Sequence, residues 1–155
     1  MSRADQARAY FREGYACAQA VALAFADLAD VDTDALERIL LPFGGGIARQ
    51  RLTCGAVSGM VAAAGAIYAE GGVSRENKKQ VYEIVRLLCA RFVQQRGTLI
   101  CGELLARAGV DSAAGGVPEA RTEEYYKKRP CDEIVYVAAQ VLEQYLTENP
   151  PRKAE

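Results

Sequence analysis

The chain contains no histidine among its 155 residues. This absence excludes Ser-His-Asp triads, histidine metal ligands and haem held by a proximal histidine. Acid–base chemistry is therefore left to carboxylates, lysine, tyrosine or cysteine. No apolar run is long enough to span a bilayer, and the opening residues, MSRADQARAYFREG, lack the apolar core of a signal peptide. We therefore expect a cytoplasmic protein without a membrane span.

The chain also lacks an excess of charge of either sign, because 19 Lys and Arg residues are offset by 20 Asp and Glu residues. This balance gives no global attraction for nucleic acid or for an acidic membrane surface, so neither is expected as a partner. Hydrophobic residues make up 50% and charged residues 25%, which is typical of a soluble globular protein. The length fits one domain over residues 1–155 with a sizeable core.

Apolar residues recur at helical rather than alternating spacing, and capping residues or glycines mark the ends of the periodic segments. We therefore predict an all-α fold, a single-domain bundle of five to seven helices. The tail from about residue 147 is expected to be flexible. The segments with helical signals are about 4–12, 16–28, 34–41, 53–70, 74–95, 100–108, 119–128 and 131–146.

Four of the five cysteines fall at predicted helix starts: Cys17, Cys54, Cys101 and Cys131. Unpaired backbone N–H groups and the helix dipole favour an anion there, so these positions stabilise thiolate over thiol. A thiolate is both a nucleophile and a metal ligand. Buried structural thiols are the alternative for each cysteine taken alone. The gaps of 37, 47 and 30 residues contain no CxxC pair, so the four act together only if the fold gathers them.

Cys89 differs from the other cysteines, because it falls in the middle of the helix predicted over 74–95. It follows Leu88 directly and Val85 by four residues. We interpret it as a small buried hydrophobic residue.

The glycine–arginine segment, residues 44–51, precedes Cys54 with the sequence GGGIARQR. Gly44, Gly45 and Gly46 allow successive N–H groups to form an anion-binding nest, and Arg49 and Arg51 add positive charge beside Cys54. A Walker-type phosphate loop would end in Gly-Lys-Ser/Thr, which is missing. We therefore expect the segment to set the electrostatics of Cys54, with a helix stop, a tight turn and solvated arginines as the alternative.

Several of these motifs resemble the C_GCAxxG_C_C family, whose members carry four characteristic cysteines and a CGAxxG motif. The resemblance extends from about residue 5 to 146. The segments that carry it are YACAQAV at 15–21, FGGGIAR at 43–49, CGAVSG at 54–59, CGELL at 101–105, and Cys131.

The resemblance implies a small cytoplasmic bacterial or archaeal protein with a redox role assigned to its four cysteines. A similar segment occurs in a multihaem cytochrome that has an iron–sulfur centre, which brings a cluster into consideration. The chain has no CxxCH motif, so haem is not expected. Cys89 is not among the four positions of the family, in agreement with its assignment to the core.

We expect a redox-active protein in which Cys17, Cys54, Cys101 and Cys131 converge at one end of the bundle. They either hold an iron–sulfur cluster or another thiolate-bound metal, or exchange dithiol for disulfide with a redox partner protein or a small thiol or disulfide. In the exchange version Cys54 is the attacking thiolate of low pKa. In the metal version the available carboxylate ligands are Glu103 and Asp132.

A non-catalytic helical binding module with structural cysteines is the alternative function. The helix over 53–70 carries a face of small residues, which would then form the interface of a homodimer. The same residues serve equally well for close packing inside one chain. The face consists of Gly55, Gly59, Ala62, Ala63 and Ala66.

Overall fold

The computed structural model describes residues 1–151 and is all-α, as predicted. Within these residues eight regular α-helices form, rather than five to seven, and a ninth segment, α4, has left-handed residues inside it. Two 3-10 turns span Ala26–Leu28 and Leu41–Phe43. The elements are α1 (Arg3–Arg12), α2 (Cys17–Leu23), α3 (Thr33–Leu40), α4 (Gly44–Ile47), α5 (Gly55–Tyr68), α6 (Arg75–Arg96), α7 (Cys101–Arg107), α8 (Glu123–Lys128) and α9 (Cys131–Glu148).

Side-chain caps set several of the helix boundaries. Ser2 forms a capping box with Asp5 at the start of α1, and Ser74 accepts from the Asn77 N–H at the start of α6. Gly97 ends α6 in the left-handed conformation, which glycine adopts without steric penalty. These local signals explain why the helix boundaries are close to those expected from the sequence.

Three segments differ from the prediction. The helix expected over 16–28 ends at Leu23, and a 3-10 turn replaces its last part. Residues 119–122 are not helical, because α8 begins only after the cap at Thr122. The last helix continues to Glu148, past the predicted start of the flexible tail, and residues 152–155 of that tail lie outside the described residues.

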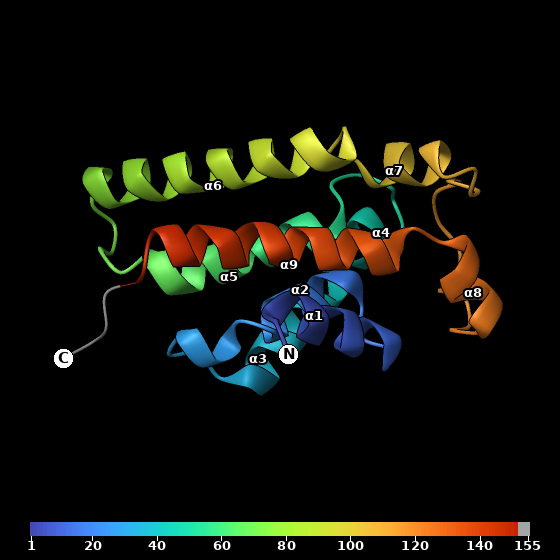
Figure 1. Ribbon diagram of the computed structural model, residues 1–155, viewed down its shortest axis with the longest axis horizontal. Coiled ribbons are helices and arrows are strands. Elements are labelled where there is room, and N and C mark those ends of the chain that lie inside the picture. The colour runs from blue at the N-terminus through green and yellow to red at the C-terminus, as the bar shows by residue number, and fades with distance from the viewer. Residues whose placement is uncertain (152–155) are drawn as a thin grey trace.

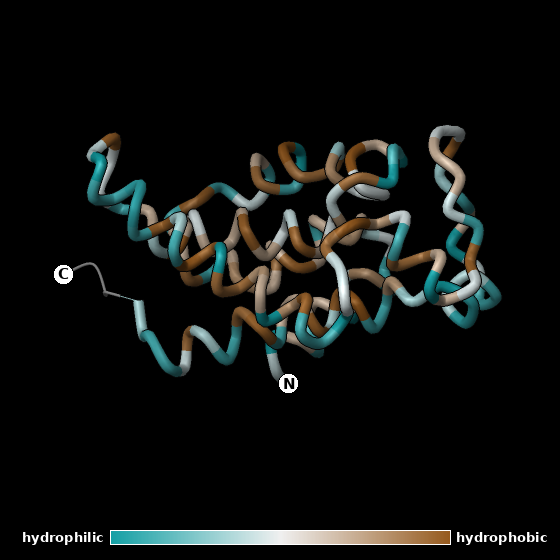
Figure 2. Tube along the Cα trace, turned by 90° about the horizontal axis from the view of Figure 1, so that it is seen from above, coloured by the Kyte–Doolittle hydropathy of each residue, from teal (hydrophilic) through white to brown (hydrophobic). Residues whose placement is uncertain are grey.

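The helices stack in three layers, with α5 and α9 in the middle (Figure 1). Helix α6 covers them on one side, and α1, α2 and α3 lie on the other. Apolar and polar residues alternate along each helix, as the hydropathy colouring in Figure 2 shows. The apolar sides meet in one main core around buried residues that include Phe11, Phe25, Met60, Phe92 and Leu142.

The small-residue face of α5 packs inside the chain, against α2. Gly59 lies so close to Ala18 that a side chain would overlap the Ala18 carbonyl oxygen. Gly55 and Ala63 are buried as well. The face is therefore used for close helix packing within one chain, which removes the reason to assign it to a dimer interface.

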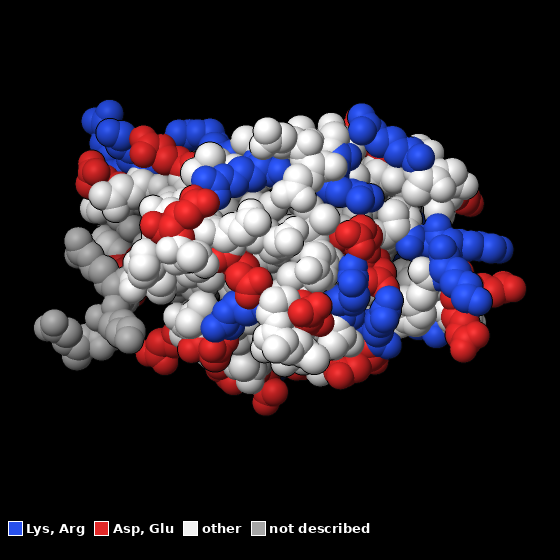
Figure 3. Space-filling view, viewed as in Figure 1, with Lys and Arg blue, Asp and Glu red and all other residues white. Residues whose placement is uncertain are grey.

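The surface in the view of Figure 3 carries positive and negative side chains in mixture, as the near-zero net charge predicts. Among residues 1–151, none of the helices combines the length and the apolar character that a bilayer crossing requires.

Candidate functional site

The four cysteines singled out in the sequence all lie at helix starts, as predicted. Cys17, Cys101 and Cys131 are the first residues of α2, α7 and α9, and Cys54 is the N-cap residue of α5. A helix start leaves backbone N–H groups without an intrahelical partner, and these groups point towards a sulfur placed there. The fold thus presents four sulfur atoms, each at the positive end of a helix dipole.

These four cysteines line a single cavity of about 570 Å³. The cavity lies at the end of the bundle where α4, α7 and α8 meet the first turn of α9 (Figure 1). Cys54 and Cys101 are buried, and Cys17 and Cys131 are partly buried. The expected convergence of Cys17, Cys54, Cys101 and Cys131 on one region is therefore present, and all four are free thiols.

A short antiparallel backbone pairing brings Cys54 and Cys101 together. The Cys54 N–H donates to the Leu99 carbonyl at 2.7 Å, and the Cys101 N–H donates to the Leu52 carbonyl at 2.6 Å. An isolated bridge between Thr53 and Ile100 lies between these bonds. Because each bond involves the backbone of a cysteine, the pairing fixes the starts of α5 and α7 side by side.

Close packing of α2 on α5 brings the next pair together. A Cβ atom on Gly55 would overlap the Cys17 sulfur, and it would lie 2.9 Å from the Phe43 carbonyl oxygen. The absence of a side chain at Gly55, the residue directly after Cys54, therefore gives the Cys17 thiol its space.

The glycine–arginine segment turns with the left-handed backbone conformation. Gly45, Gly46, Ile47, Ala48 and Arg49 have φ between 50° and 70°. Non-glycine residues adopt this region at a cost of about 1–3 kcal/mol each, and a β-branched residue such as Ile47 does so only rarely. The surrounding hydrogen bonds must hold this strained segment in place.

The strained turn forms part of the cavity wall, although Gly46 is not among the lining residues. Gly44, Gly45 and Arg49 line the cavity. The Gly45 N–H acts to lower the pKa of the Cys17 thiol, against the larger effect of burial. Gly46 packs against Cys101, where an added Cβ atom would lie 2.7 Å from the Cys101 Cβ. Glycine at both positions thus permits contact with two of the four cysteines.

The expectation that this segment lowers the pKa of Cys54 is wrong. Burial raises the pKa of the Cys54 thiol well above its ordinary value, and the neighbouring Cys17 adds to the rise. The N–H groups of Val57 and Ala56 at the start of α5 act in the opposite direction but are outweighed. Desolvation thus dominates over the helix start at Cys54.

Two more thiols follow the same pattern. Burial raises the pKa of Cys17, with the Gly45 N–H opposing it. Burial and the proximity of Cys17 raise the pKa of Cys131 to about 12, although Arg129 and Arg121 act against the rise. Burial therefore favours the neutral thiol over the thiolate at Cys17, Cys54 and Cys131.

The arginines of the segment have other partners than expected. Arg49 donates through Nε to the Gly115 carbonyl at 3.0 Å, and Arg51 places Nη1 at 3.7 Å from the Cys101 sulfur. Arg51 is only 8% exposed, so it is not a solvated arginine. The positive charge of the segment therefore stands beside Cys101 rather than Cys54.

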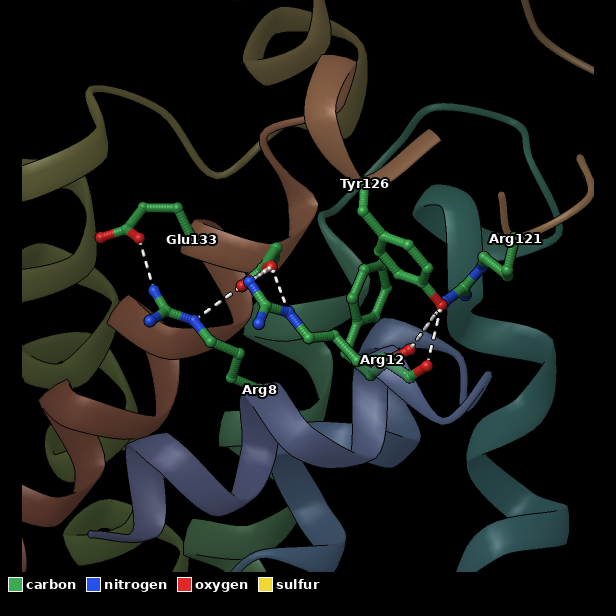
Figure 4. A network of polar contacts seen from close by, with 7 residues as sticks. Arg8, Arg12, Arg121, Tyr126 and Glu133 are labelled. Carbon is green, nitrogen blue, oxygen red and sulfur yellow. Dashed lines mark hydrogen bonds and ion pairs between the residues drawn. The ribbon is translucent and has the colours of Figure 1, made fainter. Parts of the chain in front are cut away.

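Neither carboxylate considered as a ligand lines the cavity. Asp132 accepts ion pairs from Arg8 and Arg12 at 2.6 Å, on the side that faces α1. Figure 4 shows Arg8 and Arg12 reaching from α1 to the start of α9, where Arg8 also pairs with Glu133. Asp132 thus anchors the helix that carries Cys131 and takes no part in the sulfur site.

Glu103 is also directed elsewhere, because its carboxylate accepts a hydrogen bond of 2.5 Å from the Thr98 hydroxyl. The ligand atoms that line the cavity are therefore sulfur atoms, together with the carboxylate of Glu119.

Cys89 is partly buried in the middle of α6, packs against the main core and does not line the cavity. Its assignment as a hydrophobic residue of the core agrees with this position.

Sequence reasoning missed the cations that α8 and the loop before it contribute. Arg121 donates to the carbonyls of Phe11 and Tyr15 and lies over the Phe11 ring, 4.2 Å from its centroid. Arg129 is 8% exposed and pairs with Glu119. Both arginines line the cavity, and both lower the pKa of Cys131. No local sequence signal reveals these positions, because they depend on how the loop folds back over α1.

The spacing of the thiols bears on the kind of centre that they suit. Within residues 1–151, no group of three or more His, Cys, Asp or Glu side chains is arranged to hold a single metal ion. The four thiols line one cavity without forming such a group.

The fold and the cavity define a class: a helical protein in which four cysteines from four helix starts line one site. The family model described as "Putative redox-active protein (C_GCAxxG_C_C)" matches residues 15–145, and the chain belongs to this family. The match includes all four cysteines of the cavity. No curated protein and no solved structure shows significant similarity to the chain.

Proposed function

We propose that this protein is a cytoplasmic electron-transfer protein whose four cavity cysteines hold an iron–sulfur cluster. The observation that carries the proposal is the convergence of Cys17, Cys54, Cys101 and Cys131 on one cavity from four helix starts. Membership of a redox-active family supports the redox role.

The donor set fits such a cluster. Four cysteine thiolates are the usual ligands of two-iron and four-iron clusters, and the chain offers no histidine as a competing ligand. A bound cluster would supply one-electron transfer. Donors to sulfur set the potential of iron–sulfur centres, and the Arg51 guanidinium is such a donor to Cys101.

The charges around the thiols also fit an anionic centre. The cavity is lined by Arg49, Arg51, Arg121 and Arg129 against one carboxylate, Glu119, which is paired with Arg129. Four thiolates bring four negative charges into this site when a metal centre binds. The surplus of arginines offsets part of that charge in a partly desolvated place, where charge compensation matters most.

Dithiol–disulfide exchange is less well supported. An attacking cysteine needs a thiolate and an accessible sulfur, whereas burial raises the pKa of Cys17, Cys54 and Cys131. Cys54, the expected nucleophile, is 6% exposed.

The test is anaerobic purification and reconstitution with iron and sulfide, followed by iron and sulfide analysis, visible absorption and electron paramagnetic resonance of the reduced protein. We expect iron and sulfide in a fixed stoichiometry with visible absorption that bleaches on reduction. If the protein takes up neither iron nor sulfide and instead forms a reversible disulfide between cavity cysteines, the cluster proposal is rejected in favour of dithiol–disulfide exchange. If the protein binds zinc and no iron, the cavity holds a structural metal and the proposed redox centre is rejected.

A further inference from the structure

Two arginines at the cavity are equally buried but differ in their partners. Arg51 and Arg129 are each 8% exposed. Arg129 pairs with Glu119. Within residues 1–151, no carboxylate lies within 4.0 Å of the Arg51 guanidinium. Arg51 therefore places a positive charge inside the protein without an acidic partner.

The surroundings of Arg51 hold its side chain at the cavity. Its Nε donates to the Ala113 carbonyl at 3.3 Å, and its Nη1 donates to the Cys101 sulfur at 3.7 Å. Its backbone is fixed on both sides, because the Arg51 N–H donates to Gly45 and the Arg51 carbonyl accepts from Gly102. Arg51 also lines the cavity, and its Nη1 lies beside the sulfur of Cys101, another lining residue.

The chain retains this charge at a cost in stability. A buried ionised group without a counter-charge is unfavourable by several kcal/mol, and such groups are found paired or bound to a ligand. The carbonyl of Ala113 accepts a hydrogen bond from Arg51 but carries no charge that could offset the guanidinium. An anion that enters the cavity would supply the missing counter-charge.

We propose that Arg51 forms an anion subsite in the cavity, as the fixed counter-charge of an occupant with net negative charge. Arg51 would act as the counter-charge of any anion in the cavity. The identification of that anion as a cluster rests on the function proposed above. A cluster bound by four thiolates is such an anion, and a positive charge beside Cys101 favours its reduced state over its oxidised state. Arg51 is then a positioning residue that sets the reduction potential.

The alternative role for Arg51 is purely structural, as an anchor for the loop around Ala113. Lysine distinguishes the roles, because it retains the charge but cannot reproduce the planar donor geometry of guanidinium. Arg51 has φ of +62°, so glycine fits its backbone and removes the charge without added strain. The informative variants are Arg51→Lys, Arg51→Gln and Arg51→Gly, with Arg107→Gln in α7 as a control for loss of an exposed charge.

The first measurement is a redox titration of the reconstituted proteins. Arg51→Gln and Arg51→Gly should bind the transferred electron about tenfold less tightly, a fall of about 59 mV in the midpoint potential of a one-electron couple. Arg51→Lys and Arg107→Gln should remain near the wild-type value. Failure of both neutral variants to take up iron, with normal helical circular dichroism and uptake by Arg51→Lys, would support the same counter-charge. The counter-charge role would be overturned if the neutral variants kept the wild-type midpoint potential. It would also be overturned if Arg51→Lys and Arg51→Gln lost midpoint potential or iron uptake equally.

The second measurement uses the cluster-free protein and inorganic phosphate as the probe, with potassium chloride at equal ionic strength as the reference. Phosphate should raise the thermal unfolding midpoint of the wild type and of Arg51→Lys more than that of Arg51→Gly. Equal shifts in all three proteins would overturn the anion subsite. If the wild type binds no iron but phosphate still stabilises it more than Arg51→Gly, the proposed cluster is rejected and the anion subsite is retained. Failure of the cluster proposal is therefore distinguishable from failure of the subsite proposal.

Discussion

Cys89 and the four cavity cysteines differ in their position within a helix and in the groups that surround their sulfur atoms. Cys89 lies in the middle of α6, where its own helix satisfies the backbone N–H groups, and it packs against the core. The other four lie at helix starts, where N–H groups without intrahelical partners face a shared space. The residue type is the same, and the backbone around it differs.

The comparison also separates two effects that act on a thiol at a helix start. The helix start favours the thiolate, and burial favours the neutral thiol. At Cys54 burial dominates, so the N–H groups of Ala56 and Val57 only moderate a raised pKa. Helix-start placement therefore does not by itself produce a reactive thiolate.

The largest expected effect follows from removing one cavity cysteine. Cys131→Ala should abolish the native cluster signal, because three sulfur ligands would remain. The nearby carboxylates of Glu119 and Asp132 are held in ion pairs with arginines. Iron and sulfide content and the visible spectrum measure this loss. Retention of the full wild-type iron content and spectrum would show that Cys131 is not a ligand.

Two glycines of α5 give a matched pair for the space around Cys17. A Cβ atom at Gly55 would overlap the Cys17 sulfur, whereas at Gly65 it would meet no atom within 4 Å. Gly55→Ala should destabilise the fold by about 1–3 kcal/mol and reduce cluster uptake. Gly65→Ala should stabilise it by about 0.5–1 kcal/mol, because alanine is the better helix residue. Urea unfolding monitored by circular dichroism compares them, and equal effects would contradict the close approach at Gly55.

The acidic residues after Cys131 test whether the site depends on the anchoring of α9. Asp132→Asn breaks the ion pairs with Arg8 and Arg12 and should lower the free energy of unfolding by about 1–3 kcal/mol. The stoichiometry of iron should stay unchanged, since Asp132 does not line the cavity. Glu133→Gln should change stability by about 0.5 kcal/mol or less, because Glu133 is exposed. Loss of iron in Asp132→Asn at unchanged helical content would identify the carboxylate as a ligand after all.

The smallest effect is expected at Cys89. Cys89→Ala should leave iron content, spectrum and midpoint potential as in the wild type, because Cys89 is not at the cavity. The change in the free energy of unfolding should be about 1 kcal/mol or less, since the residue is only partly buried. A shifted potential would connect Cys89 to the site.

The sequence was informative where local signals decide the structure. The cap at Ser74 and the left-handed glycine at Gly97 placed the longest helix, and the helix starts placed the four cysteines. It was less informative for Cys54, whose pKa depends on desolvation by parts of the chain that are distant in sequence. Burial of this kind is a property of the packed molecule.

The arginines show the same limit. Arg121 reaches the cavity only because its guanidinium bonds carbonyls more than 100 residues earlier, at Phe11 and Tyr15. Arg51 is buried beside Cys101 because its segment turns left-handed and then pairs with residues 99–102. Neither arrangement has a local pattern that would distinguish these arginines from solvated ones.

The backbone pairing between residues 51–54 and 99–102 determines which lengths in this chain are free to vary. The ladder fixes Cys54 and Cys101 relative to their own neighbours, and it leaves the length of the intervening chain unconstrained. Lengthening a surface loop adds only about 0.6 kcal/mol per doubling, whereas one residue inserted between Leu52 and Cys54 would shift the register of the pairing. The site is thus encoded by four short segments of fixed length, and the connections between them can vary in length. A search for other proteins with this site should therefore hold the four segments fixed and allow any length between them.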